Sequence, residues 1–162
     1  MRTTFALITA ALLCAAAPVL GQQSSGDTEL QLQGNVHVGG SGDQDSGSVN
    51  GRLGRFFTDY QEIGLDATGT FQADGKFGGS GGAFYRYNFS TGNIVPYLGA
   101  SAGSTFGQGQ TSTIAKAEAG VRFFVDRKTA FTVETTKTYF FKTKEYDKGL
   151  TIQFGFSHLW GK

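Results

Sequence analysis

The sequence predicts an all-β fold, an eight-stranded antiparallel up-and-down barrel that spans a membrane. Three observations support this prediction. Runs of alternating apolar and polar residues recur along the chain, and short segments rich in glycine and polar residues separate them. Aromatic residues gather near the ends of these runs. The face opposite the apolar one carries charges of both signs.

The first residues are typical of a secretory signal peptide. Arg2 precedes an apolar run from Phe5 to about Ala17, which is too short for a transmembrane helix. We place the cleavage near Gly21, so that residues 1–21 are the signal peptide and residues 22–162 form one barrel domain. Cleavage there removes the only cysteine, Cys14, and the mature chain then has no disulfide and no thiol chemistry.

The charge of the mature chain argues against nucleic acid as a partner. The full sequence has 14 basic and 13 acidic residues, and loss of the basic Arg2 leaves 13 of each. No basic run stands out. After the signal peptide, no stretch approaches 18 consecutive apolar residues, so the sequence predicts no transmembrane helix.

Eight strands are predicted, each long enough to cross a membrane when tilted. They cover approximately residues 28–39, 48–58, 62–72, 78–89, 94–106, 113–125, 130–141 and 150–160. The tight connections, DYQ, STGN and DRK, all fall on the periplasmic side if the chain starts there. The longer and more charged connections mostly fall outside, as in bacterial outer-membrane barrels. The phase of the strand over residues 94–106 stays open, because small and apolar residues occupy both of its faces.

The polar faces of the predicted strands carry a set of charged residues. Its members are Arg52, Glu62, Asp66, Arg86, Lys116, Glu118, Arg122 and Glu134. These are four positive and four negative charges, and a buried charge is costly unless it is paired. The balance therefore predicts a closed lumen in which these charges neutralise one another.

The aromatic residues predict two belts, one at each end of the barrel. The belt at the tight-turn end comprises Phe56, Phe57, Tyr60, Tyr87, Phe89, Tyr97, Phe123, Phe124, Phe131 and Trp160. The belt at the other end comprises Phe71, Phe77, Phe106, Tyr139, Phe140, Phe141 and Tyr146. A soluble barrel would instead bury its aromatic residues around a ligand.

Lys137 departs from this pattern, because it falls on the apolar face of its strand. Two interpretations stay open. Its ammonium group extends toward lipopolysaccharide phosphates, together with Lys142 and Lys144, or a bulge in the strand turns Lys137 inward.

The last strand carries a resemblance to a known family. Leu150, Ile152, Phe154 and Phe156 alternate along LTIQFGFSHLW, which ends in an aromatic residue. The mature chain resembles the small eight-stranded outer-membrane barrels of the OmpA membrane-domain and OmpX type. The departure is that Gly161 and Lys162 follow Trp160, whereas this family usually ends on the aromatic residue.

The resemblance implies an outer-membrane β-barrel domain over residues 22–162, located in the bacterial outer membrane. It also implies a monomer that contacts outer-membrane lipid and lipopolysaccharide, and recognition of the last strand by the outer-membrane assembly machinery.

The sequence predicts no catalytic site, no metal site and no cofactor. Ser157 and His158 are adjacent and therefore point to opposite faces, and His37 has no fixed partner. Asp43 and Asp45 lie two apart in a glycine-rich loop, which is compatible with weak Ca²⁺ binding or with a plain flexible loop. The predicted role is structural or in surface interaction. Two alternatives stay open: a narrow channel for ions or small solutes, and a secreted soluble barrel that binds an apolar ligand.

Overall fold

The computed structural model describes residues 23–37, 46–73, 75–107, 111–143, 145–146 and 150–161. The predicted signal peptide with Cys14, the loop with Asp43 and Asp45, and Lys144 lie outside these residues, as does the side chain of His37.

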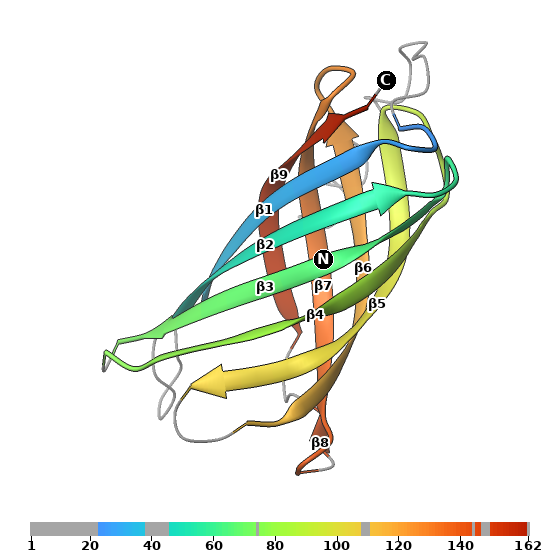
Figure 1. Ribbon diagram of the computed structural model, residues 1–162. Coiled ribbons are helices and arrows are strands. Elements are labelled where there is room, and N and C mark those ends of the chain that lie inside the picture. Colours follow the sequence, from blue (N-terminus) through green and yellow to red (C-terminus); the bar gives the residue numbers. More distant parts are fainter. Residues whose placement is uncertain are drawn as a thin grey trace, which may run out of the picture.

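The described residues form a closed antiparallel β-barrel (Figure 1). Its strands are β1 (Thr28–His37), β2 (Ser46–Phe56), β3 (Gln61–Gln72), β4 (Phe77–Asn88), β5 (Ile94–Gly107), β6 (Thr113–Phe124), β7 (Thr129–Phe140), β8 (Glu145–Tyr146) and β9 (Thr151–Trp160). Consecutive long strands pair with each other, and β9 pairs with both β7 and β1, which closes the barrel. The two-residue β8 only extends the pairing of β7 at Tyr139 and Phe140. Within the described part of the chain, no helix is long and apolar enough to cross a membrane.

The predicted fold class, an eight-stranded up-and-down barrel, is confirmed. All eight predicted strands are present, with ends within two residues of the predicted ones. Apart from β5, the strands could be located because apolar and polar residues alternate along each of them, and side chains in a strand alternate between its two faces. The short β8 was not predicted, since the charged segment that contains it shows no alternation.

Apolar residues cover the outside of the barrel and polar residues fill its inside. Leu65 on β3 is 67% exposed and Phe156 on β9 is 63% exposed, whereas Glu134 and Arg86 on the inner face are fully buried. This distribution is the reverse of that in a soluble barrel and is typical of a wall that faces lipid. The alternative of a soluble barrel with an apolar ligand inside is therefore wrong.

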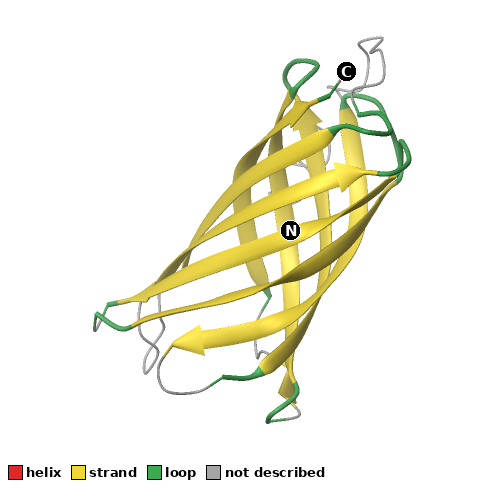
Figure 2. Ribbon diagram, viewed as in Figure 1, coloured by secondary structure: helices red, strands yellow, loops and turns green. Residues whose placement is uncertain are grey.

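The two ends of the barrel differ, as Figure 2 shows. One end, the turn end, holds the turns at residues 57–60, 89–93 and 125–128, and here β1 begins and β9 ends with the pair Thr28 and Trp160. The longer connections lie at the opposite end, which we call the loop end.

Some aromatic residues that were predicted to belong to the two belts lie inside the barrel instead. Phe56, Tyr97 and Phe124 are buried in the lumen near the turn end, and Phe140 takes an inward position near the loop end. The prediction was wrong at these positions because an aromatic residue at a strand end is compatible with either face. The outer surface retains ring contacts at both ends, with Tyr60 stacked on Tyr87 at 6.5 Å and Phe71 tilted against Phe77 at 5.4 Å.

The β6–β7 turn is held by Asp126, whose carboxylate accepts hydrogen bonds from the backbone N–H groups of Lys128 (2.7 Å) and Thr129 (2.8 Å). These N–H groups, that of Lys128 first, hold the pKa of Asp126 below its ordinary value. The ionised form of Asp126 therefore stabilises the turn at pH values above the pKa that this carboxyl has in the unfolded chain. This contribution is lost as the pH falls through its pKa in the folded protein.

We expect the difference in unfolding free energy between wild type and Asp126→Asn to shrink as the pH is lowered through this range. A difference that stays constant in acid would contradict this role.

Candidate functional site: the ion-pair network in the lumen

The eight charged residues predicted for the polar face all point into the lumen. Each lies on the inward phase of its strand, and all except Lys116 are buried. Lys116 keeps 13% of its side chain exposed. Strand register brings several of them together directly, because Arg52 is paired with Asp66 and Glu62 with Arg86 across neighbouring strands.

Glu134 is the central acceptor of the network. Its Oε2 accepts hydrogen bonds from Arg52 (2.6 Å), from Arg86 (3.4 Å) and from the hydroxyl of Tyr97 (2.7 Å). Arg52 also donates to Glu118 at 2.8 Å. One carboxylate on β7 thus holds together side chains from β2, β4 and β5.

Arg122 forms the centre of a second group, closer to the turn end. Its Nη2 lies 2.6 Å from Glu29 Oε2 and 2.8 Å from Glu62 Oε2, and its Nη1 donates to Asn88 at 3.0 Å. Arg86 lies between the two groups, 3.1 Å from Glu62 and 3.6 Å from Glu29. The network is therefore continuous from Arg52 to Arg122.

Glu29 was missed in the prediction, although the sequence held a signal for it. It alternates with Leu30 and Leu32 on β1, so it had to lie on the inner face once these leucines were placed outside. With Glu29, the described inner face carries five acidic and four basic residues. The prediction of four acidic and four basic residues on this face is thus wrong.

Lys116 and Asp66 form a pair of their own, nearer the loop end. The Lys116 Nζ lies 3.1 Å from Asp66 Oδ2 and 3.4 Å from the hydroxyl of Ser80. The pair crosses the lumen from β6 to β3, so it links opposite parts of the barrel wall.

The three arginines alternate with aromatic rings in a column along the lumen. The order is Phe56, Arg122, Tyr97, Arg86, Phe84 and Arg52, with successive guanidinium-to-ring distances of 5.7, 5.2, 4.3, 5.3 and 5.6 Å. A guanidinium over an aromatic face gains a cation–π attraction, which is larger where water is excluded. The column therefore gives these cations partners in directions that the carboxylates do not fill.

Gly120 makes room for Tyr97 in this column. A Cβ atom at position 120 would collide with the Tyr97 ring and would lie 2.8 Å from the carbonyl oxygen of Val133. We expect Gly120→Ala to destabilise the barrel by about 1–3 kcal/mol, as overpacking of an interior does. Unfolding in urea with the folded protein in detergent measures this. Gly51→Ala is the control, because the nearest atom to its new Cβ, Leu32 Cδ2, lies at 3.6 Å, an ordinary contact distance. No loss for Gly120→Ala would show that Tyr97 moves freely.

The turn end of the lumen is closed by a cluster that we call the apolar layer. Its members are the buried side chains of Phe56, Val95, Phe124, Ala130 and Leu159. Next to it lies Gln23, whose side-chain amide donates to the carbonyls of Asp59 (3.0 Å) and Ser90 (3.3 Å) in two different turns. The charged network alone was predicted to close the lumen, and the apolar layer was not foreseen.

No arrangement suited to catalysis is found among the described residues. Ser157 points inward, whereas His158 points outward and stacks on Trp160 at 6.2 Å. The described residues also hold no group of three or more side chains able to bind a metal ion. What the lumen can do chemically is to hold charges of both signs in fixed positions.

Lys137 faces the outside of the barrel. The β6–β7 pairing runs without interruption from Ile114–Phe140 to Phe124–Ala130, with Lys137 opposite Ala117. The interpretation that a bulge turns Lys137 inward is therefore wrong. Lys142, just beyond β7, is exposed.

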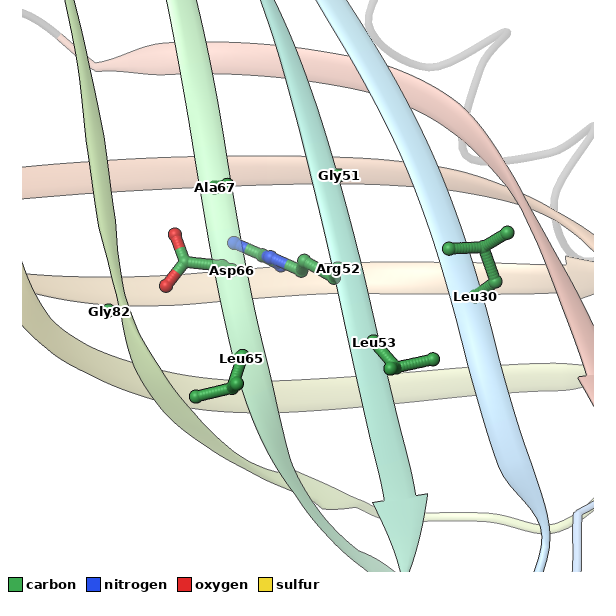
Figure 3. Close-up of a pocket in the computed structure, with 8 residues that line it drawn as sticks. All are labelled: Leu30, Gly51, Arg52, Leu53, Leu65, Asp66, Ala67 and Gly82. Carbon is green, nitrogen blue, oxygen red and sulfur yellow. The ribbon is translucent and has the colours of Figure 1, made fainter.

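The outer wall has a shallow apolar hollow beside the network. It has a volume of about 530 Å³ over β1 to β4, and Figure 3 shows the residues that line it. Leu30, Leu53 and Leu65 face outward here, while Arg52 and Asp66 in the same wall point into the lumen. Small residues, such as Gly51 and Ala67, leave the surface indented. A hollow with this lining suits a lipid chain and not a polar solute.

The similarity of this chain to known proteins is found in its structure and not in its sequence. No protein-family model and no curated protein matches the sequence. The barrel is similar to the N-terminal β-barrel domain of Pseudomonas aeruginosa OprF, with a TM-score of 0.68 and 16% identity over 85% of this chain and 100% of that chain. It is also similar to Neisserial surface protein A, with a TM-score of 0.55 and 17% identity over 84% of this chain and 94% of that one.

A de novo designed transmembrane β-barrel aligns too, with a TM-score of 0.54 and 15% identity over 87% of this chain and 100% of the design. The fold is that of a transmembrane β-barrel. The predicted resemblance to the small eight-stranded barrels is thereby confirmed for the fold.

Proposed function

We propose that this protein is a bacterial outer-membrane β-barrel with a structural or surface-interaction role and a closed lumen. The observation that carries the proposal is the filled interior. Arg86, Arg122 and Glu134 are fully buried in the middle of the lumen, and the apolar layer lies beyond them. An eight-stranded barrel is just wide enough for side chains to fill, so such a lumen leaves no path for a solute.

The same geometry supports a protein that is not an enzyme. In the described part of the chain, the charged groups of the lumen are occupied with one another, as Glu134 is with Arg52, Arg86 and Tyr97. A catalytic acid or base needs access to a substrate. The network instead holds distant strands in register.

We further propose that the turn end faces the periplasm and the loop end faces the outside. Short periplasmic turns and longer external loops are typical of outer-membrane barrels. A monomer in contact with outer-membrane lipid fits an outer face on which large apolar residues, such as Leu65 and Phe156, are exposed. The alternating outward residues of β9, Ile152, Phe154 and Phe156, fit recognition by the outer-membrane assembly machinery.

Two measurements test this proposal. Density-gradient separation of membranes is expected to place the protein in the outer-membrane fraction. Purified wild-type protein in planar lipid bilayers is expected to give no stable conductance steps. Discrete conductance would instead support the alternative of a narrow channel for ions or small solutes, gated by rearrangement of the lumen pairs.

Lys137, Lys142 and Lys144 are proposed to contact lipopolysaccharide phosphates at the loop end. A lysine near an anionic membrane surface contributes about 1 kcal/mol, so we expect Lys137→Ala to weaken lipopolysaccharide binding roughly fivefold. Binding of purified lipopolysaccharide to the protein in detergent measures this. Arg55→Ala is the matched control, because Arg55 also faces outward but lies near the turn end. An equal loss in both variants would argue against a site at the loop end.

A further inference from the structure

One wall of the lumen carries polar atoms that the protein itself does not satisfy. Of the twelve buried side-chain atoms without a hydrogen-bond partner among the described residues, seven lie on the neighbouring strands β1, β7 and β9. The other five are Asn50 Oδ1, Glu118 Oε2 and the Nε atoms of Arg52, Arg86 and Arg122. The seven atoms belong to residues that we call the polar wall: Glu29, Gln31, Gln33, Thr132, Gln153 and Ser157. Their exposed fractions lie between 0% and 8%, so bulk solvent does not satisfy them.

These residues are neighbours in the sheet and form one continuous strip. Gln31 pairs with Ser157, and Gly155 is paired with both Gln33 and Thr132. One step nearer the loop end, Gln153 is paired with Glu134. The strip runs beside the arginine column, in which Arg86 donates to Gln31 Oε1 at 3.0 Å. The Nη atoms of the arginines are hydrogen-bonded, but their Nε atoms and these atoms of the polar wall are not.

We propose that the polar wall binds a row of water molecules that enters from the loop end and stops at the apolar layer. Buried polar groups are almost always hydrogen-bonded, and ordered water satisfies those that the protein does not. This inference rests on the proposed function, because it specifies which part of the closed lumen stops water. The apolar layer is then the seal, and the row of water lies beside the buried ion-pair network.

The distribution of exposure along the lumen supports entry from the loop end. Inward residues there, such as Ser48, Thr68, Thr105 and Thr138, are only half-buried, whereas those beside the network are buried. At the turn end, the apolar layer offers no side-chain donor or acceptor, and its members come from β2, β5, β6, β7 and β9. A hydrophobic constriction blocks water and ions by dewetting.

Water contacts of side-chain amides test the polar wall in the wild-type protein. In micelles, the Nε2 protons of Gln31 and Gln33 are expected to show magnetisation transfer from long-lived water. Those of Asn88 are the control, because its Nδ2 already donates to Tyr60 O at 3.1 Å and the residue is fully buried. Absence of water contacts at both glutamines, or equal contacts at Asn88, would overturn the proposal.

Potassium leakage from vesicles tests the seal. The double variant Phe124→Ala, Leu159→Ala is expected to leak roughly tenfold faster than wild type, because the dewetted layer is removed. The control, Phe123→Ala, Ile152→Ala, removes as many carbon atoms from the lipid face of the same two strands and is expected to match wild type. If the double variant does not fold, each single substitution replaces it. Folded seal variants that stay as tight as wild type would overturn the proposal.

Different experimental results would contradict this inference and the proposed function. A wild-type protein that itself conducts, or that is absent from the outer membrane, would contradict the proposed function. A tight wild type with dry glutamines would leave the closed barrel intact and contradict only the hydrated wall.

Discussion

Replacing Glu134 with alanine is expected to destabilise the barrel by about 3–5 kcal/mol, because the buried positive charges of Arg52 and Arg86 then lose this carboxylate partner. Its Oε2 accepts from Arg52, Arg86 and Tyr97 at 2.6, 3.4 and 2.7 Å, and no residue in this group is more than 3% exposed. Without the carboxylate, Arg52 retains only Glu118, and Tyr97 retains no acceptor among the described hydrogen bonds. The expected result is an earlier midpoint in a urea titration of the folded protein in lipid vesicles, followed by the fluorescence of Trp160.

Glu134→Gln separates the loss of charge from the loss of shape. The amide keeps a carbonyl oxygen that accepts hydrogen bonds, so this variant is expected to lose less stability than Glu134→Ala. Equal stability of wild type and both variants would contradict the assignment of Glu134 as the central acceptor.

Arg122→Ala is expected to be the second most damaging change, also in the range of about 3–5 kcal/mol. The guanidinium lies 2.6 Å from Glu29 and 2.8 Å from Glu62, and all three residues are buried. Glu62 keeps Arg86 at 3.1 Å, but Glu29 is left with Arg86 only at 3.6 Å. The cost should therefore arise mainly from Glu29, and Arg122→Ala combined with Glu29→Gln is expected to recover part of the stability.

Arg127→Ala is the matched control for this prediction. Arg127 is an exposed residue in the β6–β7 turn, and substitutions at such sites usually change stability by about 0.5 kcal/mol or less. Unfolding in urea that does not distinguish Arg122→Ala from Arg127→Ala would contradict a structural role for the network.

The long strands other than β5 could be predicted because each has one apolar and one polar face. Leu30, Leu32 and Ile63 had to lie on one side, and Arg52 and Asp66 had to lie on the other. Two features indicated that the apolar face points outward. The strands are long enough to cross a membrane, and the charged residues on the other face need partners inside the barrel. These features are local in sequence, so one chain is enough to show them.

The interior contacts could not be predicted, because they depend on residues far apart in sequence. Tyr97 lies on β5, where small residues, alanines on one face and glycines on the other, leave the alternation without a clear phase. Its hydroxyl reaches Glu134, 37 residues away. Phe56 and Phe124 end their strands, where an aromatic residue suits either the lumen or the lipid interface. The register of the closed barrel decides between these positions.

A closed transmembrane barrel, with its charged residues inside and its apolar residues facing lipid, is tested most directly by electrophoresis of the outer-membrane fraction. Boiled and unboiled samples are run side by side. We expect the protein to be present in this fraction and its mobility to shift on boiling, because a closed barrel resists detergent until it is heated. A protein that is soluble without detergent and shows no shift would contradict this structure, since Arg52, Arg86 and Arg122 would then face water.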